Sequence, residues 1–294
     1  MTTDRTSEMT EHILHGAAYR LAHEDLDFLA EDDLRPVRLQ LELIKPERAL
    51  RHHEIHSTVV VFGSARIVSP DVAKKQLEDA RADCRSGPTS EKWLLDAERR
   101  VHWSRYYAEA RRFSELVSRE FQRAGRRDFV TVTGGGPGVM EAANLGAFDV
   151  GARSAGLNVT LPSEQKPNPF ITPDLAFRFH YFAIRKMHFL MRAKALVAFP
   201  GGYGTLDELF EVLTLVQTRK MQSLPIILFG GKFWNRAIDF DFLVGEGMIS
   251  PQDRDLFCFV ETAEEAVSLL KDYYGGHPPD GPTNVQMHDM KEVK

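Results

Sequence analysis

Three segments of small residues stand where predicted strands end, and each could bring backbone N–H groups close to a phosphate. They are Gly63-Ser64-Ala65-Arg66, residues 134–138 (GGGPG) and residues 200–205 (PGGYGT). In an open parallel sheet, the carboxyl ends of the strands line the ligand crevice. Glycine allows the backbone to approach a ligand there, and the helix that follows presents N–H groups and a positive dipole end to an anion. One glycine turn can simply connect two elements, but the three segments together favour a phosphate-bearing ligand.

The glycine spacing argues against two familiar classes of nucleotide site. The P-loop pattern GxxxxGK[ST] needs a Lys followed by Ser or Thr, and neither glycine-rich turn has that pair. The dinucleotide pattern GxGxxG fails as well, because Val139 stands where a third glycine would follow Gly134 and Gly136. These turns therefore fit a mononucleotide better than they fit ATP hydrolysis or hydride transfer.

The segment Thr205-Leu206-Asp207-Glu208 has two interpretations. Its Thr-x-x-Glu spacing is that of a capping box, in which Glu208 would only accept a hydrogen bond from the backbone at a helix start. A carboxylate beside a phosphate site, however, repels the ligand unless it faces another part of it. Hydrolysis of an N-glycosidic bond uses such a carboxylate, because C1′ of the ribose gains oxocarbenium character as the base leaves. The sequence leaves both interpretations open.

Arg185 and Lys186 supply adjacent positive charges near the start of a predicted helix. Such a pair is poorly placed for the helix dipole and could simply be solvated. Its position ahead of the run ALVAFPGGYGT favours a place in the site. Arg185 could then hold a phosphate or a ribose hydroxyl with its fork of donors, and Lys186 would act as a less directional charge.

Strands and helices alternate from about residue 58 to residue 276. The predicted strands cover residues 58–65, 128–135, 155–161, 175–182, 195–202, 225–231 and 256–262. Continuous apolar runs bounded by Gly or Pro indicate strands buried on both faces, and apolar residues at helical spacing lie between them. This alternation predicts right-handed βαβ units, and so an α/β fold with a doubly wound parallel sheet of about seven strands flanked by helices.

The predicted domain organisation has three parts. Residues 1–57 form a polar, partly helical extension, residues 58–276 form the nucleotide-binding domain, and residues 277–294 form a mobile tail rich in Pro and Gly. An insertion after the first strand, residues 69–104, is expected to be polar around RSGPTSEK and then helical. The run HHEIH at 52–56 lacks the HExxH spacing of a zinc helix, so a solvated segment leading into the first strand is the better interpretation.

Composition excludes several classes of protein. There are 37 Lys and Arg against 42 Asp and Glu, and a net charge of −5 argues against a general nucleic-acid binder, because phosphate backbones demand a basic surplus. No apolar run approaches the roughly 18 residues that a membrane helix needs, and no secretory signal is visible. Cys84 and Cys258 are too few for a disulfide scaffold and lack metal-ligand spacing. We expect a reduced, cytoplasmic protein.

The motifs together resemble those of the Lonely Guy family of cytokinin riboside 5′-monophosphate phosphoribohydrolases. The resemblance lies in TGGGPGVMEAAN, then the Arg185-Lys186 pair, then PGGYGTLDE beginning 15 positions after Arg185, and it covers roughly residues 58–262. It implies a Rossmann-like fold, usually dimeric, that hydrolyses the bond between an adenine-type base and ribose 5-phosphate without a metal or other cofactor. Proteins of this family are often labelled lysine decarboxylases, but no lysine here has the Ser-x-His-Lys setting of a pyridoxal enzyme.

The positions that match the family's motifs indicate which residues of this chain would form the site. The resemblance implies that Arg185 and Glu208 are the catalytic pair. With Ser64 and Gly201 added from the strand ends, the expected substrate-binding residues are Ser64, Gly135, Gly136, Gly138, Lys186, Gly201, Gly202, Tyr203, Gly204, Thr205, Leu206, Asp207 and Thr214.

The chain also departs from the compact plant-type members of the family. They have Gly after the Met of the glycine loop, where this chain has Glu141, and they lack the insertion and the long N-terminal segment. The sequence resembles a longer bacterial branch. The preferred base (adenine or an N6-modified adenine) and the size of the expected homo-oligomer stay open, and we expect neither nucleic acid nor membrane as a partner.

Two other functions compete with hydrolysis. A nucleotide-binding or sensing module without turnover would keep the glycine turns but would not need Arg185 and Glu208 at this spacing. Transfer of the ribosyl group to an acceptor other than water would use the same residues as hydrolysis, so the sequence does not separate the two reactions.

Overall fold

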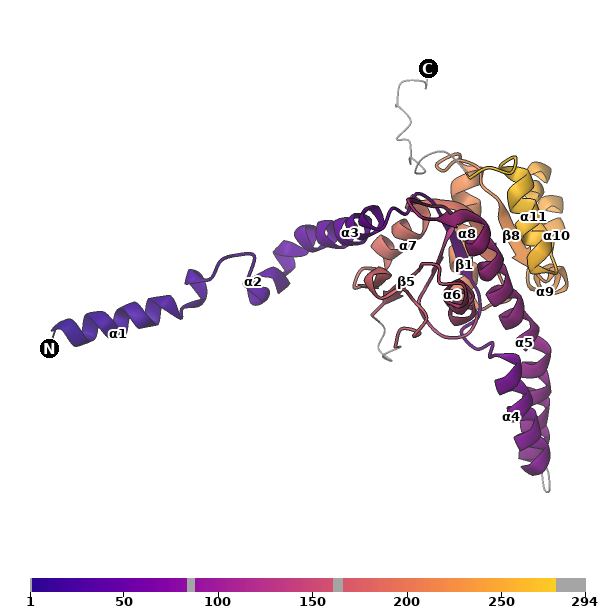
Figure 1. Ribbon diagram of the computed structural model, residues 1–294, viewed down its shortest axis with the longest axis horizontal. Helices are drawn as coiled ribbons and strands as arrows, with labels where there is room; N and C mark the ends of the chain where they lie inside the picture. The colour runs from indigo at the N-terminus through magenta and orange to yellow at the C-terminus, as the bar shows by residue number, and fades with distance from the viewer. Residues whose placement is uncertain (1, 84–87, 161–165, 279–294) are drawn as a thin grey trace, which may run out of the picture. The chain divides into compact units, whose positions relative to one another are not determined.

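The computed structural model describes residues 2–83, 88–160 and 166–278 (Figure 1). Within these ranges seven strands form one parallel sheet, in the order β6-β5-β4-β1-β7-β8-β9. The strands are β1 (Thr58–Phe62), β4 (Val130–Thr133), β5 (Ser154–Val159), β6 (Ala176–Phe179), β7 (Ala193–Ala198), β8 (Ile226–Phe229) and β9 (Cys258–Val260). Each overlaps its predicted run, so the doubly wound α/β fold is confirmed; Leu161, at the end of the third run, lies outside the described residues.

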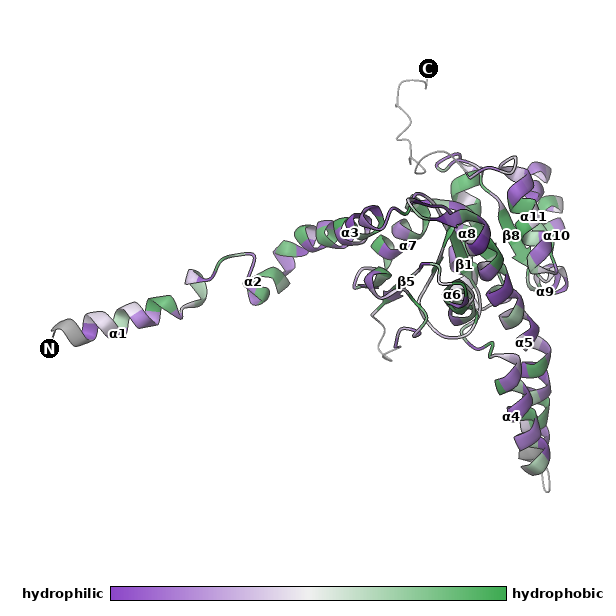
Figure 2. Ribbon diagram, viewed as in Figure 1, coloured by the Kyte–Doolittle hydropathy of each residue, from purple (hydrophilic) through white to green (hydrophobic). Residues whose placement is uncertain are grey.

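The central strands are buried on both faces, as their continuous apolar runs predict. Every residue of β1, β4, β7 and β8 is buried, and β8 is uniformly hydrophobic in Figure 2. Side chains alternate along β1: Val60 and Phe62 join one hydrophobic cluster, and Val59 and Val61 join the other. The sheet therefore separates two cores.

Helices cover both faces of the sheet. One cluster takes in the C-terminal end of α3 (Arg35–His52), together with α7 (Phe182–Met191), α8 (Tyr203–Gln217), α9 (Gly231–Ala237) and α10 (Phe240–Gly245). The other takes in α5 (Pro88–Phe121), α6 (Val139–Asp149) and α11 (Ala263–Tyr273). This arrangement fixes the two helices that start beside the glycine turns, α6 and α8, on opposite faces.

The insertion after β1 is helical on both sides of residues 84–87, including the described part of RSGPTSEK. It consists of α4 (Pro70–Asp83) and the start of the 34-residue α5, which begins at Pro88. The two helices pack along each other. Ala73, Ala80 and Ala97 are fully or almost fully buried, and such small side chains give a weak hydrophobic pattern in the sequence. Residues 84–87, which include Cys84 and part of RSGPTSEK, lie outside the described residues.

A short antiparallel pair was not predicted. Strands β2 (Gln122–Arg123) and β3 (Arg126–Arg127) pair across Gly125, which has φ of 81°. Their residues are polar and each strand has only two residues, so neither apolar runs nor alternation could indicate them.

The chain divides into two compact units, one ending at Lys45 and one starting at Pro46. The first contains α1 (Thr2–Leu14) and α2 (Leu26–Ala30), whose N-cap Asp25 accepts hydrogen bonds from the next turn. The division expected at residue 57 and the tail from residue 277 stay predictions, and residues 279–294 lie outside the described part. Ile55 is 2% exposed, so HHEIH is not simply a solvated segment. None of the helices described has the length and hydrophobicity needed to cross a bilayer.

Helices α5 and α6 approach each other closely at Gly146, which lies within α6. A Cβ atom at this position would collide with the backbone carbonyl of Arg111 on α5. We therefore expect Gly146→Ala to lower the free energy of unfolding by roughly 1–3 kcal/mol, because overpacking outweighs the better helix propensity of alanine. Urea denaturation measures this change. Gly245→Ala, at a helical glycine with open space around it, is the matched control, and an equal effect at both positions would contradict the assignment.

Candidate functional site

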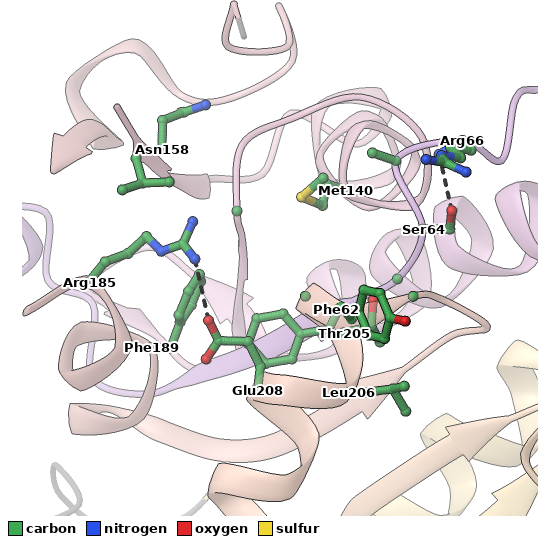
Figure 3. Close-up of a pocket in the computed structure, with 17 residues that line it drawn as sticks. Phe62, Ser64, Arg66, Met140, Asn158, Arg185, Phe189, Thr205, Leu206 and Glu208 are labelled. Carbon is green, nitrogen blue, oxygen red and sulfur yellow. Dashed lines mark hydrogen bonds and ion pairs between the residues drawn. The ribbon is translucent and has the colours of Figure 1, made fainter. Parts of the chain in front are cut away.

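A cavity of about 580 Å³ opens where the carboxyl ends of the central strands meet (Figure 3). Its lining comes from the ends of β1 and β5, from the segments that follow β1, β4 and β7, and from helices α6, α7 and α8. The lining residues are Phe62, Gly63, Ser64, Ala65, Arg66, Gly134, Met140, Asn158, Val159, Arg185, Phe189, Gly202, Tyr203, Gly204, Thr205, Leu206 and Glu208.

The order of the strands explains this convergence. The chain proceeds from β1 outward through β4, β5 and β6, and then returns to β7 on the other side of β1. The loops after β1, β4 and β7 therefore diverge at a topological switch point, which is where open α/β sheets bind ligands. All three small-residue segments predicted to form a site contribute residues to the cavity or its rim.

Glu208 lies on the buried face of the amphipathic helix α8. Thr205, Glu208, Leu209, Val212 and Val216 are the buried residues of this helix. Leu209 and Val212 pack in the core, so the same face of α8 directs Glu208 toward the interior. The side chain of Glu208 is only 6% exposed. The burial of Glu208 thus follows from helical spacing rather than from a loop.

The capping-box interpretation of Thr205 and Glu208 is wrong. Helix α8 already begins at Tyr203, its N-cap is Gly202, and no side chain caps its first turn. Thr205 is therefore the third helical residue, and its own N–H donates to Gly202 O. The first-turn amides of α8 stand at the cavity without a side-chain acceptor.

Arg185 faces Glu208 across the cavity wall, from the neighbouring helix α7. Its Nη2 lies 3.4 Å from Glu208 Oε1, and Figure 3 shows the two groups pointing toward each other. The guanidinium lies 4.4 Å from the ring centroid of Phe182 and 5.6 Å from that of Phe189, within the range of cation–π attraction. Among the described residues, the buried Nε of Arg185 has no hydrogen-bond partner.

Burial dominates the ionisation of both groups. Desolvation raises the pKa of Glu208 to about 7, although Lys186 and Arg185 attract its charged form and oppose the shift. Desolvation also lowers the pKa of Arg185 from its ordinary value, against the attraction of Glu208 and Asp207. Glu208 can therefore exchange a proton near neutral pH, as groups that perform acid–base chemistry do.

Lys186 lies behind the ion pair rather than on the lining of the cavity. Its Nζ is 2.8 Å from Asp207 Oδ2, 3.0 Å from Glu211 Oε2 and 4.0 Å from Glu208 Oε2. Burial lowers the pKa of Lys186, but the hydrogen bonds to Asp207 and Glu211 outweigh burial and raise it overall. Lys186 and Asp207 were both expected to contact substrate; here they bond to each other.

Thr214 is also absent from the lining. Its hydroxyl donates to the carbonyl of Phe210 one turn earlier, and its side chain is exposed. Gly201 lines a different cavity, described below.

The glycine loop after β4 contributes less to the lining than expected. Gly134 lines the cavity, whereas Gly135, Gly136 and Gly138 do not. Gly138 has φ of 74°, and a Cβ atom there would meet the carbonyl oxygen of Ser64. Gly135 has φ of 72°, and a Cβ atom there would meet the side chain of Asn158. The requirement for glycine at positions 135 and 138 is therefore explained within the protein.

Buried amides hold this glycine loop in place. Asn168 donates from its backbone to Gly135 O and from its side chain to Gly136 O and to Asn144 Oδ1. Sequence reasoning did not single out Asn168, because a lone Asn in a polar segment has no distinctive spacing.

Several lining residues were missed for a similar reason. Asn158 and Val159 end β5, Met140 begins α6, and Phe189 comes one turn after Arg185. Their only available signal was position at the end of a predicted strand or the start of a helix. Arg66 was part of the quoted GSAR segment, and Figure 3 places it on the side of the cavity away from Arg185.

Glu141 joins α6 to the inserted helix α5. The hydroxyl of Tyr107 donates to Glu141 Oε1 at 2.8 Å, and burial together with this carboxylate raises the pKa of Tyr107. Glu141 therefore has a structural partner on α5, three positions beyond the end of the expected insertion.

The part of the chain that the structure describes contains no group of three or more His, Cys, Asp and Glu residues that could hold a metal ion. Of the three histidines in HHEIH, His53 approaches Asp174, with Nε2 3.8 Å from Oδ2.

Comparison with known proteins gives matches to parts of the chain. A family model described as "Possible lysine decarboxylase" matches residues 140–270. Cytokinin riboside 5′-monophosphate phosphoribohydrolase LOG3 of Arabidopsis thaliana is 37% identical over 94 residues, which are 32% of this chain and 44% of that protein. The corresponding LOG1 of Arabidopsis thaliana is 38% identical over 95 residues, with the same shares. The chain thus matches less than half the length of these relatives.

A solved structure is also similar. The molybdenum cofactor binding protein of the phototrophic bacterium Rippkaea orientalis aligns with 74% of this chain and 98% of its own, at 18% identity and a TM-score of 0.42.

The fold and cavity define a doubly wound α/β protein with a buried Arg–Glu pair at its switch point. The family-model match spans both the Arg185-Lys186 pair and the PGGYGTLDE motif. Together with the phosphoribohydrolase matches, it confirms the resemblance to the Lonely Guy family.

The raised pKa of Glu208 predicts a pH-dependent effect on stability. The folded pKa of about 7 exceeds the ordinary value of 4.5. The stabilisation that protonated Glu208 provides is therefore complete below about pH 4.5 and is lost as the pH rises through 7. Between pH 5 and pH 8, the unfolding free energy of the natural protein should fall by about 2–3 kcal/mol relative to Glu208→Gln. Urea titrations of both proteins measure this difference, and a constant gap between them would refute the shifted pKa.

Proposed function

We propose that the protein hydrolyses the N-glycosidic bond of a purine ribonucleoside 5′-monophosphate, releasing the free base and ribose 5-phosphate. The base is adenine or an N6-modified adenine of the cytokinin type. The observation that carries this proposal is the buried Arg185–Glu208 pair, held beside the uncapped start of α8 in one cavity. The two Arabidopsis relatives, named as phosphoribohydrolases of cytokinin riboside 5′-monophosphate, support it.

The start of α8 is the proposed phosphate site. Gly202, Tyr203, Gly204 and Thr205 line the cavity, and the first-turn N–H groups are not capped by a side chain. The N–H groups at the start of a helix and the positive end of the helix dipole attract a phosphate. The cavity volume, about 580 Å³, suits a small molecule of nucleotide size. The phosphate end of the ligand is thereby fixed on one side of Glu208.

Glu208 acts on the ribose. As the C1′–N bond breaks, its electron pair leaves with the base, and C1′ gains positive charge that the carboxylate stabilises. A water molecule adds to C1′ through its oxygen, Glu208 accepts one of its protons, and the base gains a proton on the nitrogen that left. The products differ from the substrate by one water, so the reaction balances without a metal or a redox partner.

Arg185 positions the carboxylate and favours its ionised form. Its attraction opposes the desolvation that would otherwise keep Glu208 protonated. The Nε–H group, which has no partner among the described residues, remains available to a ribose hydroxyl or a phosphate oxygen. The pair therefore binds the ligand and maintains the charge that the reaction requires. Homo-oligomerisation and cytoplasmic location stay predictions.

Replacement of Glu208 should abolish turnover. With purified protein and either AMP or isopentenyladenosine monophosphate, we expect chromatography to show the free base and ribose 5-phosphate. Glu208→Gln should reduce kcat by about 100-fold or more, in the range found for removal of preorganised electrostatic groups. Glu211→Gln, a carboxylate on the same helix that does not line the cavity, is the matched control and should retain most of the activity. Tight nucleotide binding without release of base by the natural protein would instead assign the non-catalytic sensing function.

The pH dependence of turnover should reflect the ionisation of Glu208. Because the carboxylate is the active form and its pKa is about 7, kcat/KM should fall about tenfold per pH unit below that value. Lys186→Met should move this acidic limb to higher pH, since the positive charge of Lys186 lowers the pKa of Glu208. A limb that stays in place would show that another group controls the rate.

A further inference from the structure

A second cavity of about 700 Å³ adjoins the first, on the other side of Ser64 and Arg66. Neither Arg185 nor Glu208 lines it. Its walls come from the loop after β1, the Pro200-Gly201 turn, helix α9 and the inserted helix α5. The lining residues are Ser64, Arg66, Ile67, Val68, Asp96, Arg99, Arg100, Trp103, Pro200, Gly201 and Phe233. The insertion thus supplies a wall that the proposed hydrolysis does not use.

Positive charge predominates in this lining, with three arginines against the single carboxylate of Asp96. Arg99 lies 3.4 Å from Asp96, but both side chains are well exposed, so this ion pair is weak. Arg100 donates to Gln76 Oε1 at 2.8 Å, and this amide brings no opposing charge to the cavity. No ion pair or hydrogen bond of the Arg66 guanidinium is found among the described residues; its backbone N–H donates to Ser64 Oγ at 3.1 Å. The cavity is therefore suited to an anion.

Aromatic rings form another part of the wall. Trp103 is half-buried, stacks on Tyr106 with ring centroids 5.7 Å apart, and meets Phe233 edge-on at 5.7 Å. The contact with Tyr106 fixes the indole, which also lines the cavity. A fixed indole near guanidinium groups favours a ligand with a planar ring and a phosphate, because stacking and charge-assisted hydrogen bonds then act on one molecule.

We propose that the second cavity binds a separate phosphorylated, ring-bearing molecule of the nucleotide class, distinct from the nucleotide that the first cavity would hold. Arg99 and Arg100 bind its phosphate, and Trp103 contacts its ring. Because Ser64 and Arg66 line both cavities, occupancy of one cavity changes the position or charge environment of side chains that face the other. The site does not depend on turnover in the first cavity.

Binding of adenosine 5′-diphosphate to the full chain tests this proposal. All proteins carry Glu208→Gln to prevent turnover, and calorimetry and tryptophan fluorescence are measured together. We expect two equivalents to bind, one of which quenches fluorescence. Trp103→Phe should remove the quenching but not the binding, because the other tryptophans are Trp234, which is fully buried, and Trp93, which lies outside the lining.

Loss of charge from the cavity should weaken the quenching equivalent selectively. The double variant Arg99→Gln/Arg100→Gln should bind it at least tenfold more weakly. The matched control, Arg112→Gln/Arg119→Gln, removes the same charge from the same helix at positions outside this cavity and should leave binding unchanged.

The outcomes separate this proposal from the proposed function. A single equivalent that depends on Arg99 and Arg100 but persists in Arg185→Met would support the second site and count against the first. The proposal fails if Arg99→Gln/Arg100→Gln leaves binding unchanged or if ADP does not quench Trp103. It also fails if one equivalent depends on both Arg185 and the two α5 arginines, because a single extended ligand would then span both cavities.

Discussion

A carboxylate held away from water next to a guanidinium is the interaction on which the candidate site depends. Glu208 is 6% exposed and Arg185 14%, so neither group is well solvated, and each relies on the other for compensation. Breaking such a pair by removing one partner leaves a buried charge without compensation. Two helices, α7 and α8, must therefore keep a fixed separation, and their packing on the same core cluster provides it. The aromatic rings of Phe182 and Phe189 complete the enclosure of Arg185.

The fold could be predicted because its main signal is local. Strands of a parallel sheet are buried on both faces and appear as short apolar runs, as in 58–65 and 225–231. Their ends, marked by Gly or Pro, also located the cavity. The helical insertion was less visible, because α4 and α5 meet partly through alanines, whose hydrophobic contrast with their surroundings is small. The β2–β3 hairpin depends on backbone pairing of polar residues, and no pattern of side chains in the sequence indicates that pairing.

The site could be predicted in part, and the limit is physical. The resemblance of motifs indicated Arg185 and Glu208, but it did not show which way the side chains of their neighbours point. Lys186 and Asp207 satisfy each other's charge, and Thr214 bonds to its own helix, so these three residues are occupied within the protein. Asn158 and Met140 reach the cavity because distant strands and helices converge there. Such convergence is a property of topology, and a single sequence carries no direct trace of it.

The hydrogen bond between Tyr107 and Glu141 has a consequence for how this chain could have changed over time. It joins a residue of the glycine-loop helix α6 to a residue of α5 that lies just beyond the expected insertion, across 34 positions of sequence. A lineage that replaced Tyr107 while keeping Glu141 would leave that carboxylate without its hydroxyl donor. A lineage that gained Tyr107 without the acid would leave a mostly buried hydroxyl in need of another acceptor. The two positions should therefore be inherited as a pair, and a chain that changes one of them should change the other as well.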